Sequence, residues 1–209
     1  RQGVHDTAAH LATLHRALAD HGDHPLYPEV SALADALFQA AERLPAPDPE
    51  LRPVPVHGDP KLNNIVFDAR GDAVCLVDLD TLGPMPLWQE LGDAWRSWCN
   101  RCPEDGDGSA EFDLRIFEAS ARAYLAEARR AMTPAERSAL VHGVEWIALE
   151  LSVRFAADAL QERYFGWDSS SGRFSSAGEH NLLRARGQWS LHCAVVACRP
   201  QRADVLASA

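Results

Sequence analysis

Residues 57–68 read HGDPKLNNIVFD, and residues 73–80 read AVCLVDLD. Two short apolar runs, at 65–67 and 73–77, flank a polar and glycine-containing segment at 68–72, which is typical of a β-hairpin. Polar residues precede the first run and follow the second. The hairpin therefore predicts that two polar segments, separated in the sequence, lie together at its open end.

Helical patterns surround this hairpin on both sides. Leu11, Leu14 and Leu18 recur at spacings of three and four, which predicts one face of an amphipathic helix. Thr133 followed by Pro134, with an acidic residue three positions after the threonine, is a typical helix start. The predicted helices span about 6–19, 29–44, 133–155 and 179–196. We therefore expect a mainly α protein with one small hairpin.

The charge balance narrows the range of partners. The chain has 209 residues, with 30 acidic and 20 basic side chains, for a formal charge of −10. Nucleic acids and anionic membranes both attract a basic face, so neither is expected as a partner. No apolar run approaches the roughly 20 residues that a membrane helix needs.

The cysteines favour a reduced compartment. Their number is odd, at five, and no apolar leader precedes them, so we expect a cytoplasmic protein. Two cysteine pairs, 99/102 and 193/198, suggest a zinc site, but the second pair lacks the usual close spacing. Cys75 lies in an apolar run and is interpreted as a core residue.

The polar segments around the hairpin match the needs of phosphoryl transfer. A carboxylate must hold and deprotonate the attacking hydroxyl, and a divalent cation must bridge the nucleotide phosphates. Asp59 precedes the first strand, Asn64 begins it, and Asp78 follows the second, which together supply a base and hard oxygen ligands for magnesium. Lys61, the only lysine in the chain, is near enough to stabilise charge on a γ-phosphate.

This pattern resembles a known family. The segment HGDPKLNNIVFD, together with AVCLVDLDTLGPMP and ELGDAWR at residues 73–86 and 90–96, is similar to the aminoglycoside phosphotransferase and choline kinase group of the protein-kinase-like superfamily. Within that group the chain looks closest to the N-acetylhexosamine 1-kinase branch. The resemblance spans about residues 11–196 and includes LELSVRFAADALQERYF and EHNLLRARGQW, at 149–165 and 179–189.

The resemblance implies a kinase that uses ATP and Mg²⁺. It makes Asp59 the catalytic base, assigns Asn64 and Asp78 as magnesium ligands and places Lys61 in the catalytic loop.

The resemblance also implies supporting roles around that loop. Asp93 is expected to brace the loop from a neighbouring helix, and His57 to order it rather than to act as the base. Asp80 either contacts a second metal ion or only orders the loop, and the sequence does not decide between these roles.

Three residues are candidates for the acceptor site. The resemblance places substrate contacts near Arg154 and Tyr164, and Asn63 is close to the proposed base. The implied acceptor is a sugar such as an N-acetylhexosamine, phosphorylated on its anomeric hydroxyl, with an aminoglycoside or other small alcohol as the alternative. Arg154 has a competing interpretation as a surface ion pair with Glu150, and Tyr164 as packing against its aromatic neighbours.

Part of such a kinase is missing from the sequence. The resemblance implies an N-terminal ATP lobe with a glycine-rich loop and a lysine, but residues 1–56 contain no lysine and only two glycines. We expect residues 1–199 to be the C-terminal lobe of a kinase-like α+β fold, with the catalytic loop and hairpin at 54–80 and a loosely ordered tail at 200–209. The isolated lobe is expected to be inactive. Two alternatives remain: a natural one-lobe module that binds a sugar or nucleotide, or an N-terminal lobe supplied by another chain.

Overall fold

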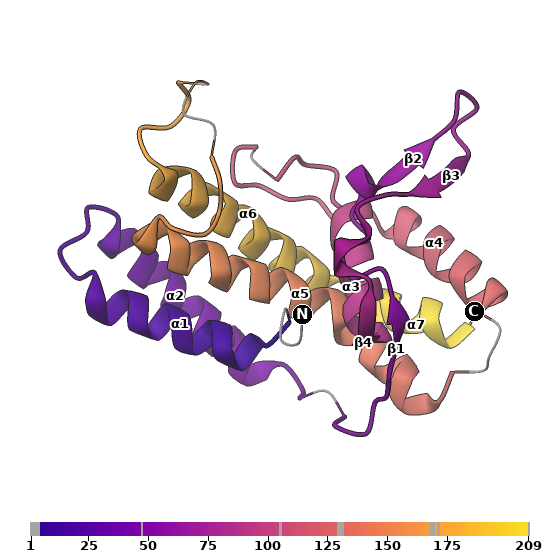
Figure 1. Ribbon diagram of the computed structural model, residues 1–209. Helices are drawn as coiled ribbons and strands as arrows, with labels where there is room; N and C mark the ends of the chain where they lie inside the picture. Colours follow the sequence, from indigo (N-terminus) through magenta and orange to yellow (C-terminus); the bar gives the residue numbers. More distant parts are fainter. Residues whose placement is uncertain are drawn as a thin grey trace.

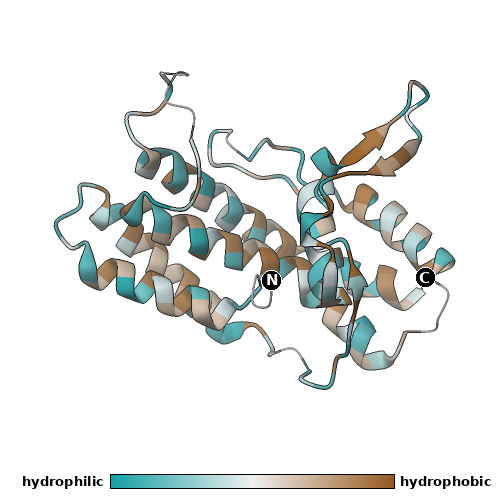
Figure 2. Ribbon diagram, viewed as in Figure 1, coloured by the Kyte–Doolittle hydropathy of each residue, from teal (hydrophilic) through white to brown (hydrophobic). Residues whose placement is uncertain are grey.

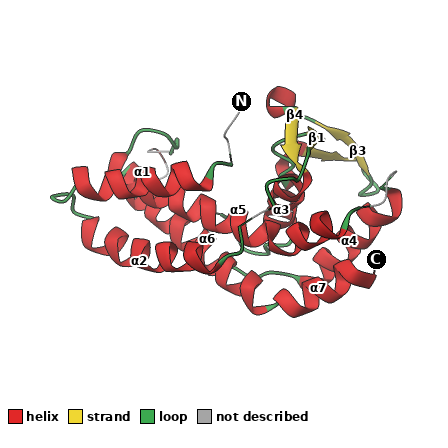
Figure 3. Cartoon of the chain, turned by 90° about the horizontal axis from the view of Figure 1, so that it is seen from below, coloured by secondary structure: helices red, strands yellow, loops and turns green. Residues whose placement is uncertain are grey.

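The computed structural model describes residues 5–46, 48–104, 106–128, 132–167, 170 and 172–208. This part of the chain is mainly helical, with four short strands (Figures 1 and 3). The helices are α1 (Thr7–Asp20), α2 (Tyr27–Arg43), α3 (Leu87–Trp98), α4 (Leu114–Glu127), α5 (Pro134–Gln161), α6 (Ala177–Ala197) and α7 (Arg199–Ser208). The strands are β1 (Pro53–Val56), β2 (Ile65–Phe67), β3 (Ala73–Leu76) and β4 (Gly83–Pro86).

The predicted hairpin and the main helices are confirmed. Strands β2 and β3 pair antiparallel, with Ile65 opposite Leu76 and Val66 opposite Cys75. The predicted helix start at Thr133 is a complete capping box, in which the Thr133 hydroxyl accepts from the Glu136 N–H and the Glu136 carboxylate accepts from the Thr133 N–H. The mainly α class with a small hairpin is therefore correct.

Helix α5 is the central helix of the molecule and contributes to two hydrophobic cores. Its C-terminal half packs with α1, α2 and α6, and its N-terminal half packs with α3, α4, α6 and α7 (Figure 1). The first core includes Leu14, Leu37, Leu149, Phe155 and Leu182. The second includes Trp95, Phe117, Val144, Ile147 and Leu191. A helix that is apolar on several sides is buried, as α5 is.

A second small sheet was not predicted. Strands β1 and β4 pair antiparallel, with Val54 opposite Met85, on either side of the segment that contains the hairpin. Prolines in both strands leave ladder positions without an N–H donor, which a two-stranded sheet tolerates because both strands are edges. Residues 57–82, which contain the catalytic loop and the hairpin, connect β1 to β4. The pairing of these two strands therefore holds the beginning and the end of this segment together.

The expectation of a loosely ordered tail at 200–209 is wrong for the described residues. Residues 199–208 form α7, with Arg202, Val205 and Leu206 buried. Arg202 is fully buried and pairs with Glu145 on α5. The sequence of the tail does not reveal that it is buried, because Glu145, the partner of Arg202, lies about 60 positions away.

Hydropathy distinguishes the hairpin from the helices. Figure 2 shows the helices with apolar residues turned inward, whereas β2 and β3 are largely apolar although they project from the body. Among the described residues, no helix is long and apolar enough to cross a membrane.

Candidate active site

The catalytic loop is closed by contacts with the strand that returns from the hairpin. His57 donates from Nε2 to the Val77 carbonyl oxygen, at 2.9 Å, and the Val77 N–H donates to the Asn64 carbonyl oxygen, also at 2.9 Å. These two bonds place Asp78, the next residue, beside Asn64. His57 Nδ1 accepts from the Asp59 N–H at 3.3 Å, so backbone contacts occupy both ring nitrogens.

Gly58 is required by the geometry of this loop. Its φ is +85°, a conformation that side chains rarely adopt, and a Cβ at this position would lie 2.5 Å from the Thr81 carbonyl oxygen. Thr81 also donates from its hydroxyl to the His57 carbonyl oxygen at 2.9 Å. The glycine between His57 and Asp59 therefore lets the loop pack directly on the segment that follows the hairpin.

A carboxylate from α3 holds the loop backbone, and it belongs to Glu90. Its two oxygens accept from the N–H groups of His57, at 3.0 Å, and Gly58, at 2.9 Å. Burial raises the pKa of Glu90, and these two hydrogen bonds partly oppose that rise. Asp93, which was expected to brace the loop, instead pairs with Arg96 at 2.8 Å. The sequence analysis missed Glu90, although it lies one helical turn from Asp93.

The last turn of α3 adds two further contacts to the same loop. The Ser97 hydroxyl accepts from the Leu62 N–H at 2.9 Å, and the Trp98 indole N–H donates to the Pro60 carbonyl oxygen at 2.8 Å. Glu90 and Ser97 are seven residues apart and therefore lie on one face of the helix. That spacing is a sequence signal that could have indicated this face of α3, but it was not used in the prediction.

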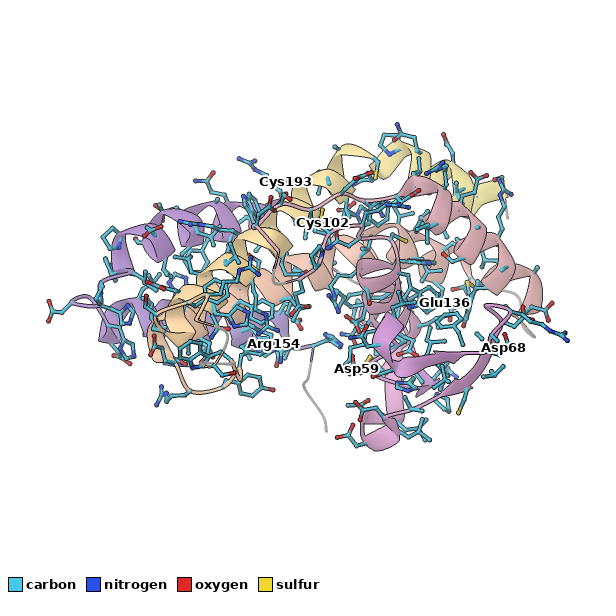
Figure 4. The ribbon with its side chains drawn as sticks, turned by 90° about the horizontal axis from the view of Figure 1, so that it is seen from above. Asp59, Asp68, Cys102, Glu136, Arg154 and Cys193 are labelled. Atoms are coloured by element: carbon cyan, nitrogen blue, oxygen red, sulfur yellow. The ribbon has the colours of Figure 1, made fainter. Side chains whose placement is uncertain are left out.

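The proposed base and the loop asparagine are in direct contact. Lys61 Nζ lies 2.5 Å from Asp59 Oδ2, and Asn64 Nδ2 donates to the same oxygen at 3.1 Å and to the Asp59 carbonyl oxygen at 2.8 Å. The structure thus brings Asp59, Lys61 and Asn64 together. Figure 4 shows Asp59 near the base of the hairpin.

Three carboxylates act on the Lys61 ammonium group. Burial alone would lower the pKa of Lys61, but the Asp59 hydrogen bond and the charges of Asp59, Asp78 and Asp93 outweigh it and raise the pKa. Asp78 is exposed and has left-handed backbone angles, φ 65° and ψ 57°, which are uncommon for a non-glycine residue and cluster at functional sites. Asp80 is exposed in the short turn that follows.

The candidate acceptor residues on α5 and after it contact each other. Arg154 Nη2 donates to the Tyr164 hydroxyl at 3.4 Å, and the guanidinium lies over the Tyr164 ring, 5.7 Å from its centroid. Tyr164 is 69% exposed. The alternative ion pair with Glu150 is not formed, because Glu150 is buried and instead accepts from the Thr7 hydroxyl and contacts His5. Figure 4 shows Arg154 nearer than Asp59 to the end of the molecule formed by α1 and α2.

The turn that carries Tyr164 is held by Asp158, which the sequence analysis did not single out. Its buried carboxylate accepts from the N–H groups of Arg163, Tyr164 and Phe165, at 2.8 to 2.9 Å. Asn181 on α6 donates to the same carboxylate at 3.1 Å. Tyr164 therefore has a fixed backbone although its ring is exposed.

The cysteines and other metal-binding residue types show no further site in the described ranges. All five cysteines are free, and Cys75 is exposed on β3, so its interpretation as a core residue is wrong. In the part of the chain that the structure describes, no group of three or more His, Cys, Asp or Glu side chains is placed to hold a metal ion.

A comparison with models of protein families provides evidence that is independent of this geometry. The model of the phosphotransferase enzyme family (APH) matches residues 3–133, which is more than half of the chain. The matched region contains the catalytic loop, the hairpin and α3, whereas α5, α6 and α7 lie beyond it. The chain therefore belongs to the phosphotransferase enzyme family.

Proposed function

We propose that this chain is the C-terminal lobe of an ATP-dependent kinase that phosphorylates a hydroxyl of a small molecule. Family membership supports a phosphotransferase activity in general. The observation that carries the finer proposal is the cluster of Asp59, Lys61 and Asn64, with Asp78 beside it. The proposed acceptor is a sugar, such as an N-acetylhexosamine phosphorylated on its anomeric hydroxyl.

Asp59 is the proposed base. Lys61 and Asn64 both contact its Oδ2, so among the described residues Oδ1 is left to accept the proton of an acceptor hydroxyl. Asp59 balances the charge of the Lys61 ammonium. The ammonium is proposed to turn to the γ-phosphate when the nucleotide is bound.

The residues at the open end of the hairpin fit a magnesium ion. Asn64 uses its amide nitrogen to hold Asp59, which leaves the amide oxygen, and the Asp78 carboxylate is exposed beside it. An amide oxygen and a carboxylate are the hard ligands that Mg²⁺ prefers. When bound, Mg²⁺ supplies neutralisation of charge on the nucleotide phosphates. Asp80 is close enough in sequence to assist either the ion or the turn.

Exposed apolar side chains support the proposal of a further lobe. On the hairpin Val66, Phe67, Val74 and Leu76 are each 42–60% exposed. Leu79 and Leu82, which follow the hairpin in the sequence, are more exposed than most of these four residues. A two-stranded hairpin is marginally stable in water, and large apolar side chains gathered in exposed positions mark an interaction surface. We propose that the N-terminal ATP lobe covers this patch, whether it comes from the same gene or from another chain.

The acceptor is proposed to contact Asn63, Arg154 and Tyr164. Arg154 on α5 and Tyr164 in the turn that Asp158 holds bring a guanidinium and a phenol together. Such groups bind hydroxyls by hydrogen bonds, as a sugar requires. An aminoglycoside acceptor, or a non-catalytic module that binds a sugar or nucleotide, is the alternative proposal.

Turnover with a panel of acceptors tests this function. The isolated chain and a longer gene product that carries the proposed ATP lobe are each assayed with ATP, Mg²⁺ and N-acetylglucosamine, N-acetylgalactosamine, kanamycin or choline. We expect the longer product to phosphorylate a sugar and the isolated chain to give no measurable turnover. Substantial turnover by the isolated chain contradicts the one-lobe proposal. A longer product that is inactive with every acceptor favours the binding module.

A further inference from the structure

The lysine of the catalytic loop occupies a position that usually belongs to another residue type. Residues Leu62–Asn64 form one turn of 3₁₀ helix, and Lys61 is its N-cap. Serine, threonine, aspartate and asparagine are preferred at an N-cap, because a side-chain oxygen accepts a free backbone N–H of the first turn. A lysine ammonium only donates, and that of Lys61 is directed to Asp59. The cap of this turn therefore has to come from another segment.

Ser97, in the last turn of α3, supplies this cap. Its hydroxyl oxygen accepts from the Leu62 N–H at 2.9 Å. Leu62 is 45% exposed, so water can satisfy an N–H at this position and burial does not require the contact with Ser97. The hydrogen bond therefore fixes the direction in which the chain leaves Lys61.

Trp98, the last residue of α3, holds the chain on the other side of the lysine. Its indole N–H donates to the Pro60 carbonyl oxygen at 2.8 Å. Pro60 is buried, and its ring fixes its own φ, so the backbone just before Lys61 has little freedom. Two consecutive side chains of α3 therefore contact the residues that flank Lys61.

The backbone position of Lys61 decides which carboxylate its flexible side chain meets. Nζ lies 2.5 Å from Asp59 Oδ2, and the lysine side chain is 39% exposed. An ion pair at such exposure is weak unless its geometry is fixed, since a free lysine side chain keeps many rotamers. Asp93, also on α3, is held by Arg96 at 2.8 Å, and its negative charge acts on the same ammonium. Helix α3 thus supplies both backbone contacts and a favourable charge.

We propose that Ser97 and Trp98 are positioning residues for Lys61, and that they hold its ammonium at Asp59, from where it reaches the γ-phosphate. The last step rests on the proposed function, whereas the holding of Lys61 does not. These contacts differ from those of Glu90, which accepts from the His57 and Gly58 N–H groups ahead of the base. Helix α3 therefore positions the base and the lysine through two separate sets of contacts.

The single lysine makes the inference testable on the 209-residue chain. A chain labelled with ¹⁵N at lysine contains one labelled ammonium, so its NMR signal reports Lys61 alone. The rate at which its Nζ hydrogens exchange with water, at one pH and temperature, measures how firmly the ammonium is held. Ser97→Ala and Trp98→Phe should each accelerate this exchange by about tenfold. Ser97→Thr keeps the hydroxyl and should restore slow exchange.

Two matched controls remove the same kinds of hydrogen bond elsewhere in the molecule. Trp146→Phe removes an indole N–H that donates to the Pro45 carbonyl oxygen at 3.1 Å. Ser190→Ala removes a hydroxyl that accepts from the Ala110 N–H at 3.2 Å. Both variants should exchange at the wild-type rate. Asp59→Asn removes the partner carboxylate and sets the rate expected for a lysine that is not held.

Three results overturn the inference: wild-type exchange in both Ser97→Ala and Trp98→Phe, equal acceleration in the matched controls, or exchange in wild type as fast as in Asp59→Asn. The proposed function fails separately. A two-lobe protein that phosphorylates no acceptor, while the exchange rates follow the expected pattern, removes the kinase and leaves the positioning of Lys61. In an active two-lobe protein, Ser97→Ala should lower kcat about tenfold with an unchanged KM for the acceptor, and an unchanged kcat overturns the catalytic part of the inference.

Discussion

At the residue scale, the contacts of the catalytic loop depend on which acidic side chain of α3 faces it. Glu90 and Asp93 are one turn apart on this helix, and both are buried or half-buried. The fold turns Glu90 toward the His57 and Gly58 N–H groups and turns Asp93 toward Arg96. The sequence identified the helix and the need for a carboxylate, but the choice between two acids depends on how α3 is rotated, which only tertiary packing sets.

Glu90→Gln tests this positioning role. A glutamine keeps one acceptor oxygen but directs an amide N–H₂ at the second backbone N–H, so one buried donor loses its partner. We expect kcat of the proposed two-lobe protein to fall by at least about tenfold with little change in the KM for ATP, because the base is displaced rather than the nucleotide site. Steady-state kinetics measure this effect.

The control for this prediction is Glu118→Gln on α4, where the glutamate is exposed and pairs with Arg122. It should leave kcat unchanged. Partial recovery of kcat in Glu90→Asp would support a carboxylate-specific role. An unchanged kcat in Glu90→Gln would show that the loop keeps its geometry without this contact.

At the element scale, the position of α3 is fixed where it crosses α5. A Cβ on Gly92 would lie 2.7 Å from the backbone of Gly143, and a Cβ on Gly143 would lie 2.5 Å from the Trp88 carbonyl oxygen. Two glycines therefore let the helix backbones approach closely. Since α3 carries Glu90, Ser97 and Trp98, this crossing also sets the position of the catalytic loop.

Gly143→Ala should separate the two helices. The added methyl group meets backbone rather than a flexible side chain, so relief requires a helix shift, and overpacking of this kind costs about 1–3 kcal/mol. Urea unfolding of the chain measures the change in the free energy of unfolding. Gly22→Ala is the matched control because nothing lies within 4 Å of its added Cβ. Equal stability of the two variants would contradict the close crossing.

The elements that the sequence predicted correctly are those with local signals. The hairpin follows from its apolar runs and polar turn, and α5 begins at the Thr133 capping box. The β1–β4 sheet and α7 lack such signals, because the sheet pairs proline-containing segments about 30 positions apart and α7 depends on a distant ion pair.

At the scale of the whole molecule, a buried charge cluster joins α5, α6 and α7. Glu145 is fully buried and pairs with Arg199, 2.7 Å away, and with Arg202. Burial alone would raise the pKa of Glu145, but hydrogen bonds from His142 and Arg199 and the charges of Arg199 and Arg202 lower it to about 2. Arg202 also donates to the Val195 carbonyl oxygen, at 3.1 Å, which ties α7 to α6.

This cluster predicts a defined acid sensitivity. The folded pKa of Glu145 lies below its ordinary value of 4.5, so its contribution to stability is present above pH 4.5 and is lost as the pH falls toward 2. The contribution is on the order of 3 kcal/mol. Glu145→Gln should be less stable at neutral pH and should show a weaker pH dependence of the free energy of unfolding in this window.

Denaturant unfolding at a series of pH values measures this dependence. Glu42→Gln, at an exposed position on α2, is the control and should keep the wild-type profile. A Glu145→Gln profile parallel to that of wild type would show that another carboxylate carries the acid sensitivity.

Asp59→Asn in the proposed two-lobe protein tests the role of Asp59 as the base through the rate of phosphoryl transfer. Asparagine keeps the size of the side chain and one acceptor oxygen for Lys61 and Asn64 but has no carboxylate to take the proton of the acceptor hydroxyl. We expect turnover to fall by about a thousandfold or more while the melting temperature is unchanged. Turnover at the wild-type rate would show that Asp59 is not the base.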